Sequence, residues 1–333
     1  MSSIVTRGLL SVSLGLCLAL SGGLSARADD DGLSSLKPGD PGLKTVGALA
    51  FGPQGILFVG DAQGNAVVAL DTNDRPETRS VQPIKVEGIA EKVAALLGTT
   101  GDAVTINDLA VNPASGRVYL SITRGKGREA LPAIVRVDAQ GSLEDLDLSA
   151  IPFAKIELDD LTTARRQEAI TDLAYLNGKV YLAGLSNEEF ASRFRAVPFP
   201  FQNGRLGDST SVEIYHAAHN KFETASPVRT FTTYEIDGEP CLLAAYTCTP
   251  LVKFPIKDLV PGGKVRGVTL AELGNRNKPL DLIAYTKDNQ PYLLLANSAR
   301  GVMKVAASEI AQAKPVTEAV RGGDTAGLPF ETI

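Results

Sequence analysis

The chain has 333 residues, with 33 Lys and Arg against 38 Asp and Glu, which gives a formal net charge of −5. Hydrophobic residues make up 44% and charged residues 21%, as in folded globular proteins and unlike disordered, collagen-like or disulfide-rich chains. The chain has two His and no Trp, which excludes a three-histidine zinc site and sites built on an indole ring.

Residues 1–28 have the pattern of a secretory signal peptide. Arg7 provides a positive start, residues 9–20 form a short apolar run, and residues 26–28 match an A-x-A cleavage site. The apolar run is shorter than the roughly 18 residues that a membrane-spanning helix needs. We therefore expect a periplasmic or secreted protein that has no transmembrane anchor after cleavage, with residues 29–44 as an N-terminal linker.

Cleavage at that site would lower the formal net charge from −5 to −7, because it removes Arg7 and Arg27. An acidic mature protein is a poor candidate for nucleic-acid binding, which depends on neutralising phosphates. The sequence therefore predicts no nucleic-acid partner.

A pattern of two apolar strands joined by a turn recurs along the chain. Each copy has an apolar strand, a turn rich in Gly, Asn or Asp, a second apolar strand and a third apolar stretch. The copies begin, 51 to 64 residues apart, at Ala48, Asp108, Asp172, Thr230 and Asp281. This pattern is typical of β-propeller blades, whereas β-sandwiches do not repeat a two-strand signature so regularly.

We therefore predict an all-β fold, with one β-propeller domain over residues 45–333 that has five recognisable blades and five or six in total. Residues 89–98 have the spacing and composition of one short inserted helix. Residues 328–333 either close a five-bladed ring as an added strand or begin a sixth unit.

The segments INDLAVNPASGRVYL (residues 106–120) and ITDLAYLNGKVYL (residues 170–182) carry the repeat most clearly. They resemble blades of the NHL, YVTN and SMP-30-like group of propellers. The resemblance covers most of residues 45–308 and specifies a blade, not a function.

Cys241 and Cys248 are the two cysteines beyond the predicted signal peptide. The segment CLLAAYTC reads as one strand, which would separate their Cα atoms by roughly 23 Å, and a disulfide allows at most about 7 Å. Unless this strand is broken, we expect two separate small side chains and no disulfide.

The loops after each second strand and between blades are rich in basic residues. In propellers these loops surround one mouth of the channel, and the resemblance implies that ligands bind there. The candidate residues for binding an anion are Arg124, Lys126, Arg165, Arg193, Arg229, Arg276, Lys278 and Arg300. Arginine binds carboxylate or phosphate through two parallel hydrogen bonds, so an excess of these residues would attract anions. Alternatively, these loops are merely solvated, and some of these groups pair with nearby Glu.

Three aspartates occupy the same repeat position, at the start of an inner strand. Equivalent positions converge on the axis of a propeller, so these carboxylates could share a hard cation such as Ca²⁺. The candidate metal ligands are Asp108, Asp172, Asp281, Asn107 and Asn297. The resemblance to SMP-30-like lactonases implies a metal in the channel, although Ala48 and Thr230 break the pattern in the other blades. Alternatively, each aspartate binds backbone N–H groups of its own turn.

His216 and His219 form an H-x-x-H motif in the segment SVEIYHAAHNKFE. The flanks read as a strand followed by a turn, where residues three apart point to opposite faces. No carboxylate stands at a convincing spacing, so we expect a surface hairpin with incidental histidines.

Two functions fit these patterns. The first is an exported binding or scaffold propeller whose basic loop face takes an anionic small molecule, polymer or protein. The second is a metal-dependent lactonase or hydrolase, in which a divalent cation in the channel would polarise a carbonyl and activate water. No nucleophile elbow, dinucleotide loop, P-loop or EF-hand motif occurs, so we favour binding, without an enzymatic activity.

Overall fold

The computed structural model describes residues 32–75, 83–159, 162–202, 208–248, 250–274, 276–321 and 324–333. All strands and helices described below belong to the unit Asp31–Ile333. The predicted signal peptide lies outside the described residues.

Tight turns follow the first strand of the repeat in three of the five sheets, as the sequence predicts. Two-residue turns with positive φ at both positions join the first two strands of three sheets, at Asn177-Gly178, Asp237-Gly238 and Asp288-Asn289. Asn, Asp and Gly adopt this left-handed backbone at little cost, and its twist matches that of an antiparallel hairpin.

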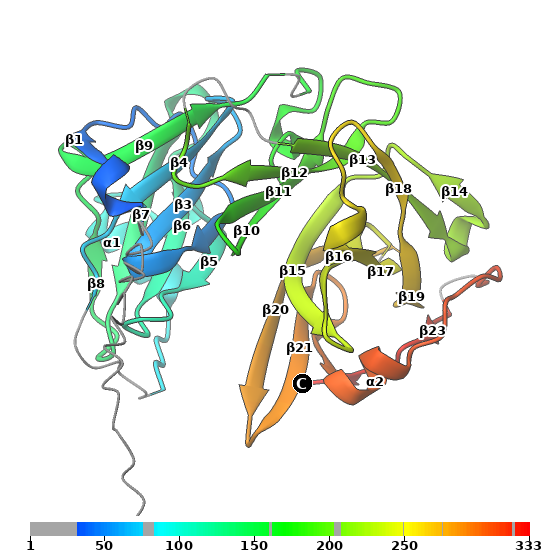
Figure 1. The fold of residues 1–333 in the computed structure, drawn as a ribbon. Coiled ribbons are helices and arrows are strands. Elements are labelled where there is room, and N and C mark those ends of the chain that lie inside the picture. Colours follow the sequence, from blue (N-terminus) through cyan, green and yellow to red (C-terminus); the bar gives the residue numbers. More distant parts are fainter. Residues whose placement is uncertain are drawn as a thin grey trace, which may run out of the picture. The chain divides into compact units, whose positions relative to one another are not determined.

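The described residues form five sheets in a β-propeller arrangement (Figure 1). The first consists, in spatial order, of β1 (Lys37–Gly39), β9 (Ile151–Glu157), β4 (Ala66–Asp71), β3 (Ile56–Asp61) and β2 (Leu49–Phe51). The second consists of β5 (Val104–Val111), β6 (Val118–Arg124), β7 (Leu131–Val137) and β8 (Leu143–Asp145). The third consists of β10 (Asp172–Leu176), β11 (Lys179–Leu185), β12 (Ser192–Pro198), β13 (Asp208–His216) and β14 (Lys221–Glu223), with β18 (Lys264–Arg266) parallel to β13.

The last two sheets follow the same plan. The fourth consists of β15 (Val228–Ile236), β16 (Glu239–Tyr246), β17 (Pro250–Pro255), β19 (Val268–Glu272) and β23 (Ala326–Gly327). The fifth consists of β20 (Pro279–Lys287), β21 (Gln290–Asn297), β22 (Gly301–Ala306) and β24 (Glu331–Thr332). Two α-helices accompany the sheets in the described residues: α1 (Ile89–Leu96), where a helix is predicted, and α2 (Ala307–Gln312).

The sheets do not follow one another in space as they do in the sequence. The inner strands contact each other in the order β5, β2, β10, β15 and β20. In the sequence, the second sheet lies between β4 and β9, which are paired neighbours in the first sheet. The chain therefore leaves the first sheet after β4, forms β5–β8 and returns to add β9 as an outer strand. The second and fifth sheets therefore stand at the two ends of the series.

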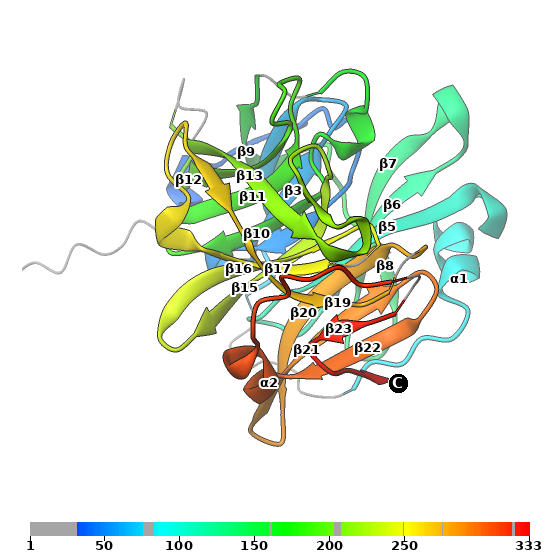
Figure 2. The same cartoon turned by 90° about the vertical axis from the view of Figure 1, so that its right-hand side faces the viewer.

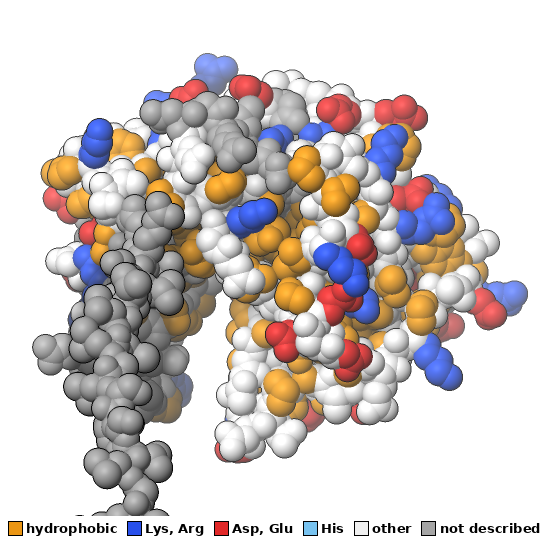
Figure 3. Space-filling view, viewed as in Figure 1, with side chains coloured by type: hydrophobic (Ala, Val, Ile, Leu, Met, Phe, Trp, Pro, Cys, Tyr) orange, Lys and Arg blue, Asp and Glu red, His pale blue; other side chains and the backbone are white. Residues whose placement is uncertain are grey.

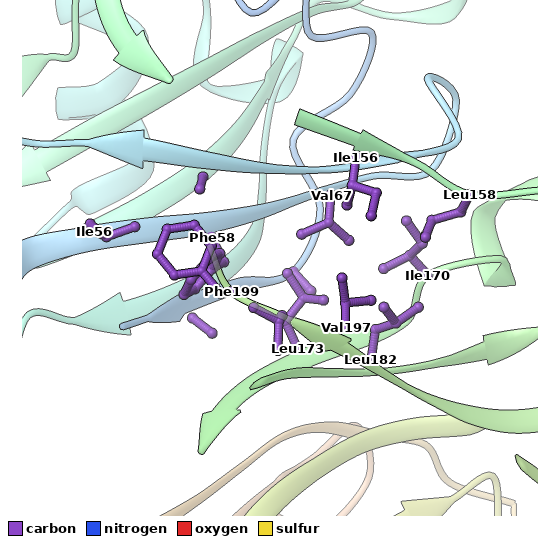
Figure 4. Packing of buried hydrophobic residues seen from close by; sticks show 14 of the residues in the cluster. Ile56, Phe58, Val67, Ile156, Leu158, Ile170, Leu173, Leu182, Val197 and Phe199 are labelled. Atoms are coloured by element: carbon purple, nitrogen blue, oxygen red, sulfur yellow. The ribbon is translucent and has the colours of Figure 1, made fainter. Parts of the chain in front are cut away.

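Each contact between neighbouring sheets has its own hydrophobic core. Between the first and third sheets, Phe58 and Val67 pack against Leu173, Val197 and Phe199 (Figure 4). The rings of Phe58 and Phe199 meet edge to face, with centroids 4.9 Å apart. Because both faces of these sheets are covered, β3 is buried along its whole length, which explains its continuous apolar sequence.

The two end sheets are covered less completely. Helix α1 packs Val93 and Leu97 against the second sheet, where a further blade would otherwise lie. Apolar side chains on the inner strands β5 and β20 stay 36–62% exposed, namely Ile106, Leu109, Val111, Leu280 and Ile283. In Figure 3 the surface is hollowed between the second and fifth sheets.

Several boundaries differ from those expected. The predicted linker contributes β1, which pairs with β9. Strand β12 includes Arg193, which the sequence analysis places in a loop. With β12 as the third strand of its sheet, β13 is the fourth. At the C-terminal end, β23 pairs with β19 and β24 pairs with β22 (Figure 2), so residues 328–333 extend the fifth sheet and do not start a sixth.

Cys241 lies buried in β16, and Cys248 follows that strand with a left-handed φ of 63°. Both cysteines are free, which confirms the expected absence of a disulfide between them. Among the described residues, no helix is long and apolar enough to span a bilayer.

Candidate functional site

The three repeat aspartates lie in the inner strands of their sheets. Asp172 is the first residue of β10, whereas Asp108 and Asp281 stand within β5 and β20. Pairing is irregular between Ile106 and Asp108 in β5, and between Pro279 and Asp281 in β20. A bulge of this kind re-aims the side chain that follows it, which gives Asp108 and Asp281 a common place in their sheets.

The aspartates connect neighbouring sheets. Oδ2 of Asp108 accepts a hydrogen bond from the N–H of Leu49 in β2 at 2.7 Å, and Oδ2 of Asp172 accepts one from Phe231 in β15 at 2.6 Å. In all three aspartates Oδ1 accepts the N–H of the next residue at 2.7–2.8 Å. Oδ2 of Asp281, in the sheet at the end of the series, has no hydrogen-bond partner among the described residues.

The three carboxylates also affect one another electrostatically. Burial, and then the charge of Asp281, raise the pKa of Asp108 to about 7. Burial, and then the charge of Asp108, raise the pKa of Asp172 well above its usual value, and burial raises that of Asp281. Neighbouring carboxylates thus contribute to the raised pKa of Asp108 and of Asp172, because like charges oppose ionisation.

Their geometry fits a role in joining the sheets better than a ready-made cation site. In the part of the chain that the structure describes, the three aspartates do not form a group whose ligand atoms lie within 4.8 Å of one another. Asn107 is engaged elsewhere, because its Nδ2 donates to the carbonyl of Val46 and to Thr123, both at 2.9 Å. The predicted metal site therefore stays a prediction, and no reaction step is derived from it.

Most of the predicted basic residues are paired. Lys126 Nζ lies 2.7 Å from Asp102. Arg165 and Arg229 both form ion pairs with Glu168, the latter at 3.2 Å, which bridges the loop before β10 and the start of β15. These three cations share two carboxylates, so the net positive charge of the loop face is smaller than the loop composition indicates.

Arg193 and Arg124 also have local partners. Arg193 lies in strand β12 and not in a loop, is 7% exposed, and contacts Glu188 at 2.5 Å and Ser209 at 2.9 Å. Its assignment to the loop face is therefore wrong. Arg124 donates from Nη1 to the carbonyl of Leu97 at 3.0 Å.

Three of the predicted cations have no acidic partner in the described residues: Arg276, Lys278 and Arg300. Their two loops are joined, because Lys278 N–H donates to Ser298 Oγ and Ser298 N–H to the Lys278 carbonyl, each at 2.9 Å. The Arg300 guanidinium packs directly on Gly274, whose φ of 94° and lack of a Cβ make room for it. Arg276 itself has a left-handed φ of 55°.

Buried hydrogen-bond donors without partners lie in the same loops. Nε of Arg300 is buried and makes no hydrogen bond within the described chain. Asn297 is 5% exposed, and its Oδ1 accepts the N–H of Ala299 at 3.0 Å, while its Nδ2 has no partner there either. Unpartnered buried donors are rare in proteins, and both of these would be satisfied by an acceptor oxygen. We call Arg276, Lys278, Arg300 and Asn297 the two-loop site.

The predicted hairpin is present, but the prediction that the two histidines point to opposite faces is wrong. A single 3₁₀ turn, Ala217–His219, brings the rings of His216 and His219 to a centroid separation of 3.9 Å, on the same side of the hairpin. Both rings contact Glu223, the carboxylate that the spacing argument missed. The Asn at position 220, which takes a left-handed φ of 51° and reverses the chain, was the signal for this turn.

No protein-family model matches the sequence, and a comparison with curated protein sequences finds no match. Among solved structures, a putative oxidoreductase (glucose dehydrogenase) from Thermus thermophilus is 14% identical with a TM-score of 0.30, covering 89% of this chain and 87% of that one. The α-L-arabinanase of Cellvibrio cellulosa is 12% identical with a TM-score of 0.37, covering 82% and 95%. A putative gluconolactonase is 12% identical with a TM-score of 0.25, covering 79% and 89%. These similarities are too low to assign a function.

Proposed function

We propose that this protein is an exported β-propeller binding protein that takes an anionic group at the two-loop site. The observation that carries the proposal is the combination there of three cations without acidic partners and two buried donors without acceptors, within the described residues. The other five predicted basic residues are bound to carboxylates or to a carbonyl.

The charge of the two-loop site favours an anionic ligand. The whole chain has a formal net charge of −5, so a local group of three cations is a departure from the rest of the surface. A guanidinium and an amide N–H₂ fixed by packing need little reordering on binding, which favours affinity. A carboxylate or a phosphate offers the acceptor oxygens that these buried donors lack.

The test is a calorimetric titration of the purified protein with citrate and with pyrophosphate, as carboxylate and phosphate probes. We expect binding by at least one probe. The variants Lys278→Gln and Arg276→Gln should each weaken it by about tenfold, since a charged hydrogen bond contributes about 1.5 kcal/mol.

The matched control is Lys287→Gln. Lys278 stands directly before β20 and Lys287 is its last residue, so both substitutions remove one lysine charge at opposite ends of one strand. The control should bind as the wild type does. Equal losses in both variants would show diffuse attraction and no site, and absence of binding by either probe would refute the proposal.

Metal-dependent hydrolysis is the second candidate, supported by the convergence of Asp108, Asp172 and Asp281. Two of these residues already use both oxygens as acceptors of backbone N–H groups. Binding is therefore the better-supported function. Hydrolysis of a lactone that requires added Ca²⁺ and is lost in Asp281→Asn would reverse this order.

A further inference from the structure

Strands β13 and β14 form a hairpin (Figure 1). His216, His219 and Glu223 all belong to this hairpin and its turn. Ile214 pairs with Glu223, and His216 stands two residues further along β13, so the side chains of His216 and Glu223 lie on one face. The 3₁₀ turn then returns His219 over the same face.

The turn is anchored from outside the hairpin. Glu272, at the end of β19, accepts the N–H of Ala217 at 2.6 Å, and the carbonyl of Ala217 accepts the N–H of Val320 at 3.1 Å. The arrangement of the two histidines is therefore preorganised by packing and does not depend on a mobile loop.

Distances within the cluster match those between ligands of one small cation. His216 Nδ1 lies 3.1 Å from Glu223 Oε2, and His219 Nδ1 lies 2.7 Å from Glu223 Oε1. One ligand atom from each residue lies within 4.8 Å of the others. Neighbouring ligands on a tetrahedral zinc ion are about 3.3 Å apart, so the two His–Glu distances are close to those of a bound ion.

A second observation is independent of these distances. His216 is 1% exposed, and its Nε2 is buried without a hydrogen-bond partner in the described chain. Nδ1, which faces Glu223, is therefore the nitrogen of this ring that can bind an ion, and burial fixes the ring in that orientation.

We propose that His216, His219 and Glu223 bind zinc or a similar first-row divalent cation, with a fourth position open to water. Two imidazoles and one carboxylate suit Zn²⁺ and Co²⁺, whereas Ca²⁺ and Mg²⁺ prefer oxygen ligands alone. The His219 side chain is 46% exposed, which gives the ion a path from solvent. A pocket of about 440 Å³ adjoins Glu223, and Lys221 and Arg165 also line it.

The positive charge of Lys221 opposes the binding of a cation at this site. Lys221 Nζ lies 3.3 Å from Glu223 Oε1, and this ammonium must turn away when the ion binds. Its side chain is 63% exposed, so solvent can receive it. Removal of this charge should therefore strengthen metal binding, whereas removal of any ligand should weaken it.

The experiment is a calorimetric titration of the purified, chelator-treated protein with Zn²⁺, and a parallel titration with Co²⁺ followed by its visible absorption. We expect one ion per chain, a tetrahedral Co²⁺ spectrum and no comparable binding of Ca²⁺. His219→Ala should weaken Zn²⁺ binding by at least about tenfold, and Lys221→Gln should strengthen it. Circular dichroism checks that both variants fold, which the exposure of both side chains favours.

Asp172→Asn is the control that separates this site from the channel aspartates, and it should leave the Zn²⁺ affinity unchanged. Failure to bind Zn²⁺, or binding that survives both His219→Ala and Glu223→Gln, would overturn the proposal. The result is independent of the anion titration, because the two-loop site contains none of these residues.

Discussion

Replacement of Asp108 by Asn should change the stability of the protein in opposite directions at low and high pH. In the folded chain, burial and then the charge of Asp281 raise the pKa of Asp108 to about 7, from an ordinary value of 3.8. A raised pKa means that the folded state prefers the protonated carboxyl. The stability contributed by Asp108 is therefore fully present below about pH 4 and lost as the pH rises through about 7.

The magnitude follows from the shift and from the hydrogen bonds. A shift of about three pKa units corresponds to roughly 4 kcal/mol, an upper value because Asp108 keeps part of its surface in solvent. Asn keeps one acceptor oxygen, so the N–H of either Leu49 or Leu109 loses its partner, at a cost of about 1–3 kcal/mol. The variant should be about 1–3 kcal/mol less stable than the wild type at pH 4, and more stable by a similar amount at pH 8.

Urea denaturation at both pH values, with EDTA present to remove any metal, measures these differences. Asp138→Asn is the control, because Asp138 accepts backbone N–H groups of Gln140 and Ser142 at 2.9 and 2.8 Å in a surface turn. The control should show no reversal of sign. If Asp108→Asn changes stability equally at pH 4 and pH 8, the raised pKa of Asp108 is refuted.

Two further substitutions test the fold. Phe58→Ala removes a side chain with 0% exposure from the core between the first and third sheets, and should lower the free energy of unfolding by about 3–5 kcal/mol in urea titrations; a loss below about 1 kcal/mol would contradict this packing. Asp74 is buried, which opposes its ionisation, but hydrogen bonds from Ser115 and Asn112 outweigh burial and lower its pKa. The stability that Asp74 contributes is lost as the pH falls. Asp74→Ala should therefore lower the free energy of unfolding by about 3 kcal/mol at pH 7 and by clearly less at pH 3. Urea denaturation at both pH values measures this, and an equal loss at both would contradict the lowered pKa of Asp74.

The repeat could be predicted because its signals are local. The Asn177-Gly178 and Asp237-Gly238 turns and the apolar runs beside them fix the hairpins through interactions of neighbouring residues. The spatial order of the sheets was not predictable in this way. It depends on the return of β9 to β4, a pairing of segments about 85 residues apart that no local pattern records.

The site was predicted only in part, for the same reason. Arg193 looks like a loop residue because charged side chains are seldom buried, yet β12 buries it beside Glu188. Arg229 is neutralised by Glu168, which is 61 residues away in the sequence. Charge counts along the chain find candidate cations, whereas their pairing is a property of the folded structure.

The histidine cluster was missed because the alternation of side chains along a strand was applied to two residues at a turn. That alternation sends His216 and His219 to opposite faces, whereas the 3₁₀ turn puts them together. A local reading of Asn220 as a left-handed turn residue would have found the reversal and Glu223 behind it.

The most direct test of anion binding is to locate the anion. Crystals of the protein soaked in selenate, examined by anomalous diffraction, should show selenium between the loops 274–278 and 297–301. Its oxygens should lie within hydrogen-bond distance of Arg300 Nε and Asn297 Nδ2. Selenate at other sites only, with this place empty, would contradict the account.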